Sequence, residues 1–231
     1  LKKKIMKKAI VLLSGGMDSA VTTAIALKLG FEVAALHLNY GQRTQEREMK
    51  AFTQLCDYYE ITEKLIVDIS YLAEIGGSSL TDIKLNVFDA KLNSKDIPNT
   101  YVPFRNANIL AIATSWAEVI GATAIFIGAN QVDSSGYPDT RLEFFEAAQK
   151  MIDLGTKPET KIKIETPIIK MSKSEIISLG SELGVPFELT WSCYRNNEIA
   201  CGTCDSCALR LKGFDEVGIF DPIEYETRPK Y

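Results

Sequence analysis

Histidine is nearly missing from this chain of 231 residues, since the only one is His37. It ends an apolar segment, where a packed side chain is expected, so acid–base catalysis by histidine is not expected. Long apolar runs are lacking too, because the most apolar helical segment, residues 20–29, is too short to cross a bilayer and contains Lys28. Positive charge is not in excess either: the formal net charge of −4 argues against a general nucleic-acid binder.

The composition that remains is that of a globular protein. Hydrophobic residues make up 46% of the chain, which is enough for a substantial core. Residues 1–8 are basic and precede an apolar segment, but we expect no signal peptide, because that segment runs into an aspartate-bearing loop without a cleavage site. We therefore expect a cytoplasmic protein with a catalytic domain over residues 1–190 and a metal-binding segment over residues 191–231 packed on the same domain.

Short apolar runs alternate with helical patterns along the chain. We expect strands at residues 8–13, 31–38, 63–68 and 123–128, and helices at residues 19–30, 44–59, 105–120, 139–154 and 172–184. Ser172 and Glu175 form a capping box. Residues 89–100 are polar and typical of an active-site flap, and the tail after Arg210 is short and mixed. The alternation predicts an α/β fold in which helices cover both faces of a parallel sheet and a ligand binds beyond the strand ends.

The loop Ser14-Gly15-Gly16-Met17-Asp18-Ser19 joins the first expected strand to the first helix. A turn rich in Gly and Ser at this point presents backbone N–H groups at a helix N-terminus, which suits a phosphate. It is not the GxxxxGK[ST] loop, because no Lys follows the second Gly. The alternative is ordinary turn chemistry, with Asp18 as a helix cap.

Four other polar segments are expected at the same edge of the sheet. Arg43 either contacts phosphate or lies in solvent, and Lys170 or Lys173 could reach phosphates. The remaining candidates could bind a planar, purine-like ring through amides, carboxylates, a guanidinium and an aromatic plate: Arg105, Asn106, Asn130, Asp133, Tyr137 and Asp139.

Four of the five cysteines fall within fifteen residues, in the pattern Cys193-x7-Cys201-x2-Cys204-x2-Cys207. Four thiolates satisfy a tetrahedral Zn²⁺ and leave no open position, so a structural zinc is favoured. An iron–sulfur cluster is the alternative, because it also takes four cysteines. Cys56 lies on an amphipathic helical pattern and is expected in the core.

The Ser14–Ser19 loop resembles the PP-loop of ATP pyrophosphatases, which cleave ATP to AMP and pyrophosphate. Together with NYGQR, IPNTYVPFRN, DSSGYPD, TPI, WSCY and CGTCDSC, it resembles the 7-cyano-7-deazaguanine synthase family of queuosine biosynthesis, from about residue 8 to about residue 211. The resemblance implies an adenine nucleotide alpha hydrolase-like fold. It assigns catalysis to Asp18, Ser19 and Arg105, and ATP binding to Leu13, Ser14, Gly15, Gly16, Met17, Asp18, Ser19, Ala20, Val21, Thr22 and Thr23.

The same resemblance implies the reaction and its partners. Family members convert 7-carboxy-7-deazaguanine and ammonia to the nitrile through adenylated carboxylate and amide intermediates, with Mg²⁺·ATP as co-substrate. One structural Zn²⁺ per chain and a homodimer are implied, without a membrane or direct nucleic-acid partner. The chain departs from the family at Asn39, Thr44 and Thr140, and most of all at Phe104, where Gly is usual and a reshaped pocket is expected.

Two other functions compete with this interpretation. Another PP-loop enzyme, such as a tRNA-modifying thiolase or an adenylating ligase, would share the loop but would need a sulfur carrier, reactive cysteines or an RNA-binding extension. A zinc-ribbon binding module without catalysis would account for the four cysteines and leave the Ser14–Ser19 loop without a purpose.

Overall fold

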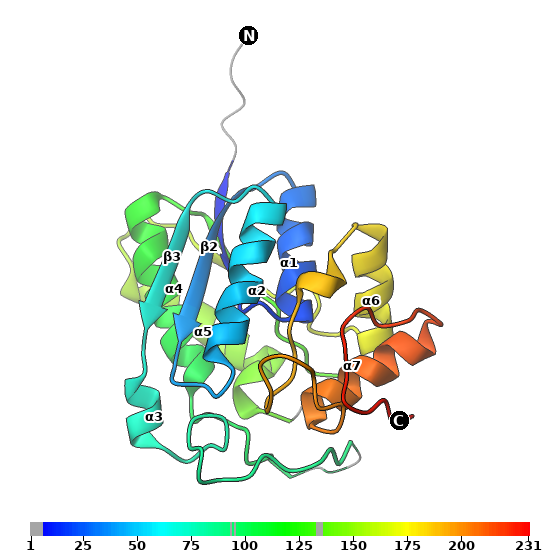
Figure 1. Cartoon of the computed structure of the whole chain (residues 1–231). Coiled ribbons are helices and arrows are strands. Elements are labelled where there is room, and N and C mark those ends of the chain that lie inside the picture. Colours follow the sequence, from blue (N-terminus) through cyan, green and yellow to red (C-terminus); the bar gives the residue numbers. More distant parts are fainter. Residues whose placement is uncertain (1–6, 93, 95, 133–135) are drawn as a thin grey trace.

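The computed structural model describes residues 7–92, 94, 96–132 and 136–231, and Figure 1 shows the whole chain. Within these residues, five parallel strands form one sheet in the order β3-β2-β1-β4-β5. The strands are β1 (Lys8–Leu12), β2 (Glu32–Asn39), β3 (Lys64–Asp68), β4 (Ala124–Ile127) and β5 (Lys163–Glu165).

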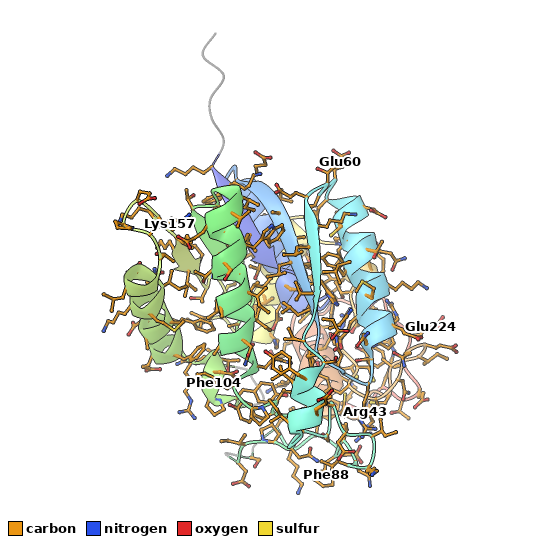
Figure 2. The ribbon with its side chains drawn as sticks, turned by 90° about the vertical axis from the view of Figure 1, so that its left-hand side faces the viewer. Arg43, Glu60, Phe88, Phe104, Lys157 and Glu224 are labelled. Carbon is orange, nitrogen blue, oxygen red and sulfur yellow. The ribbon has the colours of Figure 1, made fainter. Side chains whose placement is uncertain are left out.

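Helices connect the strands and cover both faces of the sheet. Figure 2 shows α2 and α4 on opposite sides of the strands. The helices are α1 (Met17–Lys28), α2 (Gln45–Tyr58), α3 (Tyr71–Ile75), α4 (Arg105–Ile120), α5 (Leu142–Gly155), α6 (Lys173–Glu182) and α7 (Asp205–Glu216), with short 3₁₀ turns η1 (Pro138–Thr140) and η2 (Phe187–Leu189).

Alternation along β1 explains the two layers of the core. Ala9 and Val11 point to the face covered by α1, α2 and α6, whereas Ile10 and Leu12 point to the face covered by α4 and α5. Successive side chains of a strand point to opposite faces, so an unbroken apolar strand must be covered on both. The sequence prediction of an α/β fold with helices on both faces is confirmed.

The strand order also determines where a ligand can bind. After β1 the chain moves to β2 on one side, and later it returns to β4 on the other side of β1. The connections that leave β1 and β4 therefore diverge, and the crevice between them lies at the carboxyl ends of the strands. This end faces downward in Figure 1, away from the N-terminus.

Most expected elements are found with ends shifted by one or two residues, and α4 is found as expected. The helix expected at 139–154 is wrong at its start, because Arg141 is extended and separates η1 from α5. The tail after Arg210 is not irregular: α7 continues to Glu216. The capping box of Ser172 and Glu175 is confirmed.

A buried ion pair holds the C-terminal residues against the rest of the protein. Arg210 on α7 donates from Nε and Nη2 to the two carboxylate oxygens of Asp221 at 2.8 and 2.9 Å, and both side chains are 1% exposed. Arg210 also donates to the Thr190 hydroxyl and the Phe187 carbonyl. Phe214 of α7 packs in the core layer that contains α1 and α6, so residues 191–231 share a core with the sheet.

Among the described residues, no helix has both the length and the apolar character needed to cross a membrane.

Candidate functional site

A cavity of about 290 Å³ opens at the carboxyl ends of the central strands. Its walls come from the residues after β1, β2 and β4, from the start of α4, and from the segment around the cysteines. The polar and aromatic side chains that line it are Ser14, Asp18, Ser19, Tyr40, Glu48, Arg105, Asn106, Asn130, Tyr137, Thr140, Lys173, Trp191, Ser192, Tyr194, Ser206 and Arg210. The sequence prediction of a ligand site beyond the strand ends therefore has a matching cavity.

The Ser14–Ser19 loop has the shape that an anion site needs. Gly15 has φ +90°, a conformation that other residues rarely adopt. Gly16 is the N-cap of α1 and no side chain caps it, so the first N–H groups of the helix are not taken by a capping side chain. The Ser19 hydroxyl donates to the Gly16 carbonyl at 2.8 Å and holds the turn closed. These features are those of a phosphate cradle at a helix N-terminus.

The residues assigned to ATP binding by resemblance divide into two groups. Those at the start of the segment line the cavity: Leu13, Ser14, Gly16, Met17, Asp18 and Ser19. The others lie behind it. Gly15 packs against α2, and the rest are buried on α1 among core residues: Ala20, Val21, Thr22 and Thr23.

Gly128, the residue after β4, packs directly against the start of α1. A Cβ atom at this position would lie 2.8 Å from the carbonyl carbon and oxygen of Asp18 and 2.9 Å from the amide nitrogen of Ser19. Real Cβ atoms do not approach backbone so closely, so only glycine allows β4 and the loop to meet.

Replacing Gly128 by Ala is therefore expected to displace the phosphate cradle, with a destabilisation of about 1–3 kcal/mol from overpacking and a loss of ATP affinity. Equilibrium denaturation and nucleotide binding by calorimetry would measure both effects. Gly155 is a matched control, because a Cβ there meets nothing within 4 Å. Normal nucleotide affinity in Gly128→Ala would contradict the role of this contact.

Asp18 is not the N-cap of α1, so its explanation as a helix cap is wrong. It lies in the first turn, where its Oδ2 accepts from Lys173 Nζ at 2.5 Å. Its Oδ1 is buried and has no hydrogen-bond partner among the described residues. A buried carboxylate oxygen without a donor fits a divalent cation, because such ions take oxygen ligands. Lys170, by contrast, is exposed.

Arg105 begins α4 and extends its guanidinium into the cavity. The group lies over the Tyr40 ring at 5.0 Å, and Nη1 donates to the Tyr40 hydroxyl at 3.1 Å. Its Nε is buried without a hydrogen-bond partner among the described residues. A buried guanidinium with an unused donor suits a carboxylate or phosphate.

The other candidate substrate-binding residues that the structure describes already bond to the protein. The Asp139 carboxylate accepts from the Asn106 backbone at 2.9 Å, and Asn106 Nδ2 donates to the Asp139 carbonyl at 2.8 Å. Asn130 donates to the carbonyls of Ile168 and Met171 and so holds the segment before α6. Three of the set line the cavity: Asn106, Asn130 and Tyr137.

Asp139 is not part of the cavity wall, and Asp133 lies outside the described residues. Tyr137 donates to the Thr100 hydroxyl at 2.9 Å, so this ring is held in place at the cavity wall.

Arg43 is neither a phosphate ligand nor a solvated side chain. It donates from Nε to the Ser79 carbonyl at 2.6 Å and from Nη2 to the carbonyls of Asp82 and Leu85. The side chain therefore organises the long loop after α3, at the lower edge of the molecule in Figure 2. Sequence spacing could not reveal this, because the accepting carbonyls lie about forty residues further along the chain.

Phe104 does not line the cavity. It adopts a left-handed conformation at the N-cap of α4, with φ 56°, and its side chain is 60% exposed. Its ring meets Phe144 edge-on at 6.3 Å on the outer side of α4, where Figure 2 labels it. The residues that line the cavity at this point are the next two along the chain, Arg105 and Asn106.

The four clustered cysteines meet in space. Their sulfur atoms lie within 4.8 Å of one another, and all four residues are buried. Cys201 and Cys207 Sγ are 3.9 Å apart, close to the separation of about 3.8 Å that four sulfurs bonded tetrahedrally to Zn²⁺ would have.

Backbone N–H groups of Arg195, Asn196 and Cys201 point to Cys193 Sγ, and those of Thr203 and Cys204 point to Cys201 Sγ, all at 3.4 Å. Such donors favour thiolates, so the cluster could hold a metal ion.

The segment around the cluster also forms one wall of the cavity. Tyr194, next to Cys193, lines the cavity, as do Trp191 and Ser192. The backbone N–H of Trp191 donates to the Gly15 carbonyl at 2.9 Å, so this residue contacts the Ser14–Ser19 loop. Sequence reasoning missed these residues and Glu48. The only signal was that Trp191, Ser192 and Tyr194 belong to the WSCY segment and that Glu48 follows shortly after NYGQR, which says nothing about which way a side chain points.

His37 is 1% exposed, donates from Nδ1 to the Leu13 carbonyl at 3.0 Å, and lies beside the Phe52 ring. Burial lowers the pKa of His37. Its packing in the core is as expected.

Comparisons with known proteins agree with this geometry. A family model described as queuosine biosynthesis protein QueC matches residues 8–218. A 7-cyano-7-deazaguanine synthase from Chloroherpeton thalassium is 60% identical over 224 residues, which cover 97% of this chain and 99% of the relative. The enzyme of that name from Chlorobium chlorochromatii is 58% identical over 224 residues, with 97% and 98% covered.

Among solved structures, a 4-thiouridine synthetase in complex with RNA and with bound ATP is similar at a TM-score of 0.53. The match covers 97% of this chain and 47% of that one at 19% identity, so it shows the fold alone.

Proposed function

The chain belongs to the queuosine biosynthesis protein QueC family and is an enzyme of the 7-cyano-7-deazaguanine synthase kind, and from this premise we propose how its cavity works. One observation carries the proposal: the uncapped start of α1 and the Ser14–Ser19 loop open into the same cavity as Arg105 and Lys173. We propose that ATP lies with its phosphates on the loop and that 7-carboxy-7-deazaguanine lies beside it.

The proposed reaction begins with the substrate carboxylate, whose oxygen is a poor leaving group. The carboxylate attacks the α-phosphate of ATP, so that a C–O–P linkage forms and pyrophosphate leaves. Ammonia then forms the C–N bond of an amide while AMP leaves. The amide oxygen then attacks the α-phosphate of a second ATP and pyrophosphate leaves, and loss of AMP with the two N–H protons gives the nitrile. Most of the protein's task is to position reactants and stabilise charge.

Each cavity group has a proposed part in these steps. The N–H groups at the start of α1 would hold the phosphates, and the Ser19 hydroxyl would keep closed the turn that presents them. Asp18 would hold Mg²⁺ through its unpartnered Oδ1, and the ion would supply neutralisation of the triphosphate charge. Lys173 and Arg105 would face the phosphates and the substrate carboxylate. Asn106, Asn130 and Tyr137, which line the same cavity, would contact the deazaguanine ring.

We further propose that the cysteine cluster holds one structural Zn²⁺ per chain. The four sulfurs would close the coordination sphere, so the ion would hold the wall formed by Trp191 and Tyr194 and take no part in the reaction. This makes residues 191–231 a metal-binding segment of the catalytic unit, and reduced thiolates fit a cytoplasmic enzyme. The homodimer remains a proposal from the family resemblance.

One incubation tests the reaction. The protein, Mg²⁺·ATP, ammonium and 7-carboxy-7-deazaguanine are combined, the base is followed by mass spectrometry, and nucleotides are separated by chromatography. We expect the nitrile, with two AMP and two pyrophosphate formed for each nitrile. Accumulation of the amide would support only the first half of the proposed reaction, from the carboxylate to the amide. If AMP does not exceed that of a control without the deazapurine, the proposed substrate is wrong.

A further inference from the structure

Glu48 is a carboxylate in the cavity that the steps above leave without a role. It comes from the first turn of α2 and lines the cavity together with Arg105 and Tyr40. Its backbone lies against the phosphate cradle, since a Cβ on Gly15 would lie 2.7 Å from the Glu48 carbonyl oxygen. The backbone of Glu48 therefore packs behind the loop, and its side chain lines the cavity that the loop and Arg105 also line.

The side chain is held in one position by neutral donors. Oε1 accepts from the Thr44 hydroxyl at 2.7 Å, and Oε2 accepts from Gln42 Nε2 at 3.1 Å. Gln42 is itself fixed, because its Oε1 accepts from the Tyr40 backbone N–H at 2.8 Å. Each carboxylate oxygen has a second lone pair, so the group can accept one more donor without losing these bonds.

No ion pair among the described residues includes Glu48. The other charged groups in the cavity wall are Arg105 from α4, which donates to the Tyr40 hydroxyl, Asp18, which is paired with Lys173, and Arg210, which is paired with Asp221. An anion placed beside a phosphate cradle is unfavourable unless a cation joins it. The free lone pairs of the Glu48 carboxylate suit a small cation that carries several N–H donors.

We propose that Glu48 binds the ammonium ion in this cavity and removes the proton that makes it an ammonia nucleophile, an inference that rests on the proposed function. One N–H proton moves to the Glu48 carboxylate, and the freed nitrogen lone pair attacks the carbonyl carbon of the adenylated substrate. The C–N bond forms and the C–O bond to AMP breaks. The second excess proton leaves to water, and Glu48 then returns its own proton to water.

The environment of the carboxyl group suits that transfer. Burial raises the pKa of Glu48, and the hydrogen bonds from Thr44 and Gln42 act in the opposite direction. A more basic carboxylate accepts a proton from ammonium more readily. Arg105, which carries a permanent charge, cannot do so.

The test compares two nucleophiles in Glu48→Gln. Ammonium must lose a proton before it attacks, whereas hydroxylamine is neutral at pH 7 and traps an adenylated carboxylate as a hydroxamate. With ammonium at pH 7 we expect kcat/KM to fall by about 10²–10⁴-fold, the range typical of a lost general base. With hydroxylamine we expect the wild-type rate, and with ammonium we expect the deficit to shrink as rising pH supplies free ammonia.

Glu46→Gln is the matched control, because it makes the same change on an exposed side chain of the same helix. Substrate-dependent pyrophosphate release and thermal unfolding show whether adenylation and folding are intact. Three results for Glu48→Gln would overturn the proposal: an unchanged rate with ammonium, an equal loss of rate with both nucleophiles, or a loss of pyrophosphate release. The last result would be that of a Mg²⁺ ligand. If the wild type itself releases no pyrophosphate with the deazapurine, the proposed function is what fails.

Discussion

Asp18→Asn is expected to abolish AMP formation while leaving the metal content of the cysteine cluster unchanged. The substitution keeps the volume of the side chain but removes the negative charge of the carboxylate. In the wild type, Oδ2 of this carboxylate accepts from Lys173, and Oδ1 has no hydrogen-bond partner among the described residues. If that oxygen holds Mg²⁺, its loss leaves the triphosphate charge uncompensated at the transition state. Loss of one such electrostatic contact costs about 10²–10³ in kcat, and we expect at least that effect.

The measurement is pyrophosphate release with 7-carboxy-7-deazaguanine present, at several Mg²⁺ concentrations. Asp57→Asn is the matched control, since Asp57 also pairs with a lysine, Lys64, but on the surface away from the cavity. Its rate should equal that of the wild type. Normal turnover in Asp18→Asn would remove Asp18 from the proposed mechanism and would leave the phosphate cradle to act without a carboxylate.

Cys204→Ser is expected to release the metal and to lower the stability of the whole chain. Metal binding free energy is folding free energy where the site forms only in the native state. The affected residues also form part of the cavity, because Tyr194 and Trp191 lie beside Cys193. We expect a loss of several kcal/mol, which for a chain of this length corresponds to a fall in Tm of about 10 °C or more.

Elemental analysis and thermal unfolding measure both parts of this prediction. Cys56→Ala is the matched control, since Cys56 is a buried thiol outside the cluster, and burial raises its pKa to about 11. That variant should keep its metal content and lose little stability. Full metal occupancy and an unchanged Tm in Cys204→Ser would refute the structural site. Bound iron and visible absorbance in the wild type would show that the cluster holds an iron–sulfur centre and not zinc.

The two features that are local in sequence were predictable from it. The Ser14–Ser19 loop needs only glycines and serines between an apolar strand and a helix, and these residues are consecutive. Three of the four clustered cysteines lie within seven residues, so their meeting hardly depends on the rest of the fold. The α4 boundaries were also predictable, because Gly121 follows the last residue of the helix and adopts φ 68°.

What the sequence could not reveal depends on contacts between distant segments. Arg43 looked like a phosphate ligand, but its donors are taken by carbonyls of the loop after α3. Nothing in the sequence indicated that Asn106 and Asp139, both candidates for substrate binding, bond to each other across 33 residues. A polar side chain satisfies its hydrogen bonds with whichever partner the fold supplies, and spacing along the chain does not contain that information.

By itself, the sequence determined the α/β class of the fold, the Ser14–Ser19 turn between strand and helix, and a group of four cysteines that could hold a metal ion, since each of these follows from short-range periodicity or spacing. Only the tertiary structure decided that Glu48 and Arg105 face one cavity, that Trp191 contacts Gly15, and that the cysteine segment forms part of the wall. The physical reason is that helix and loop formation depend on neighbouring residues, whereas a site forms where the packing of the core brings remote side chains together.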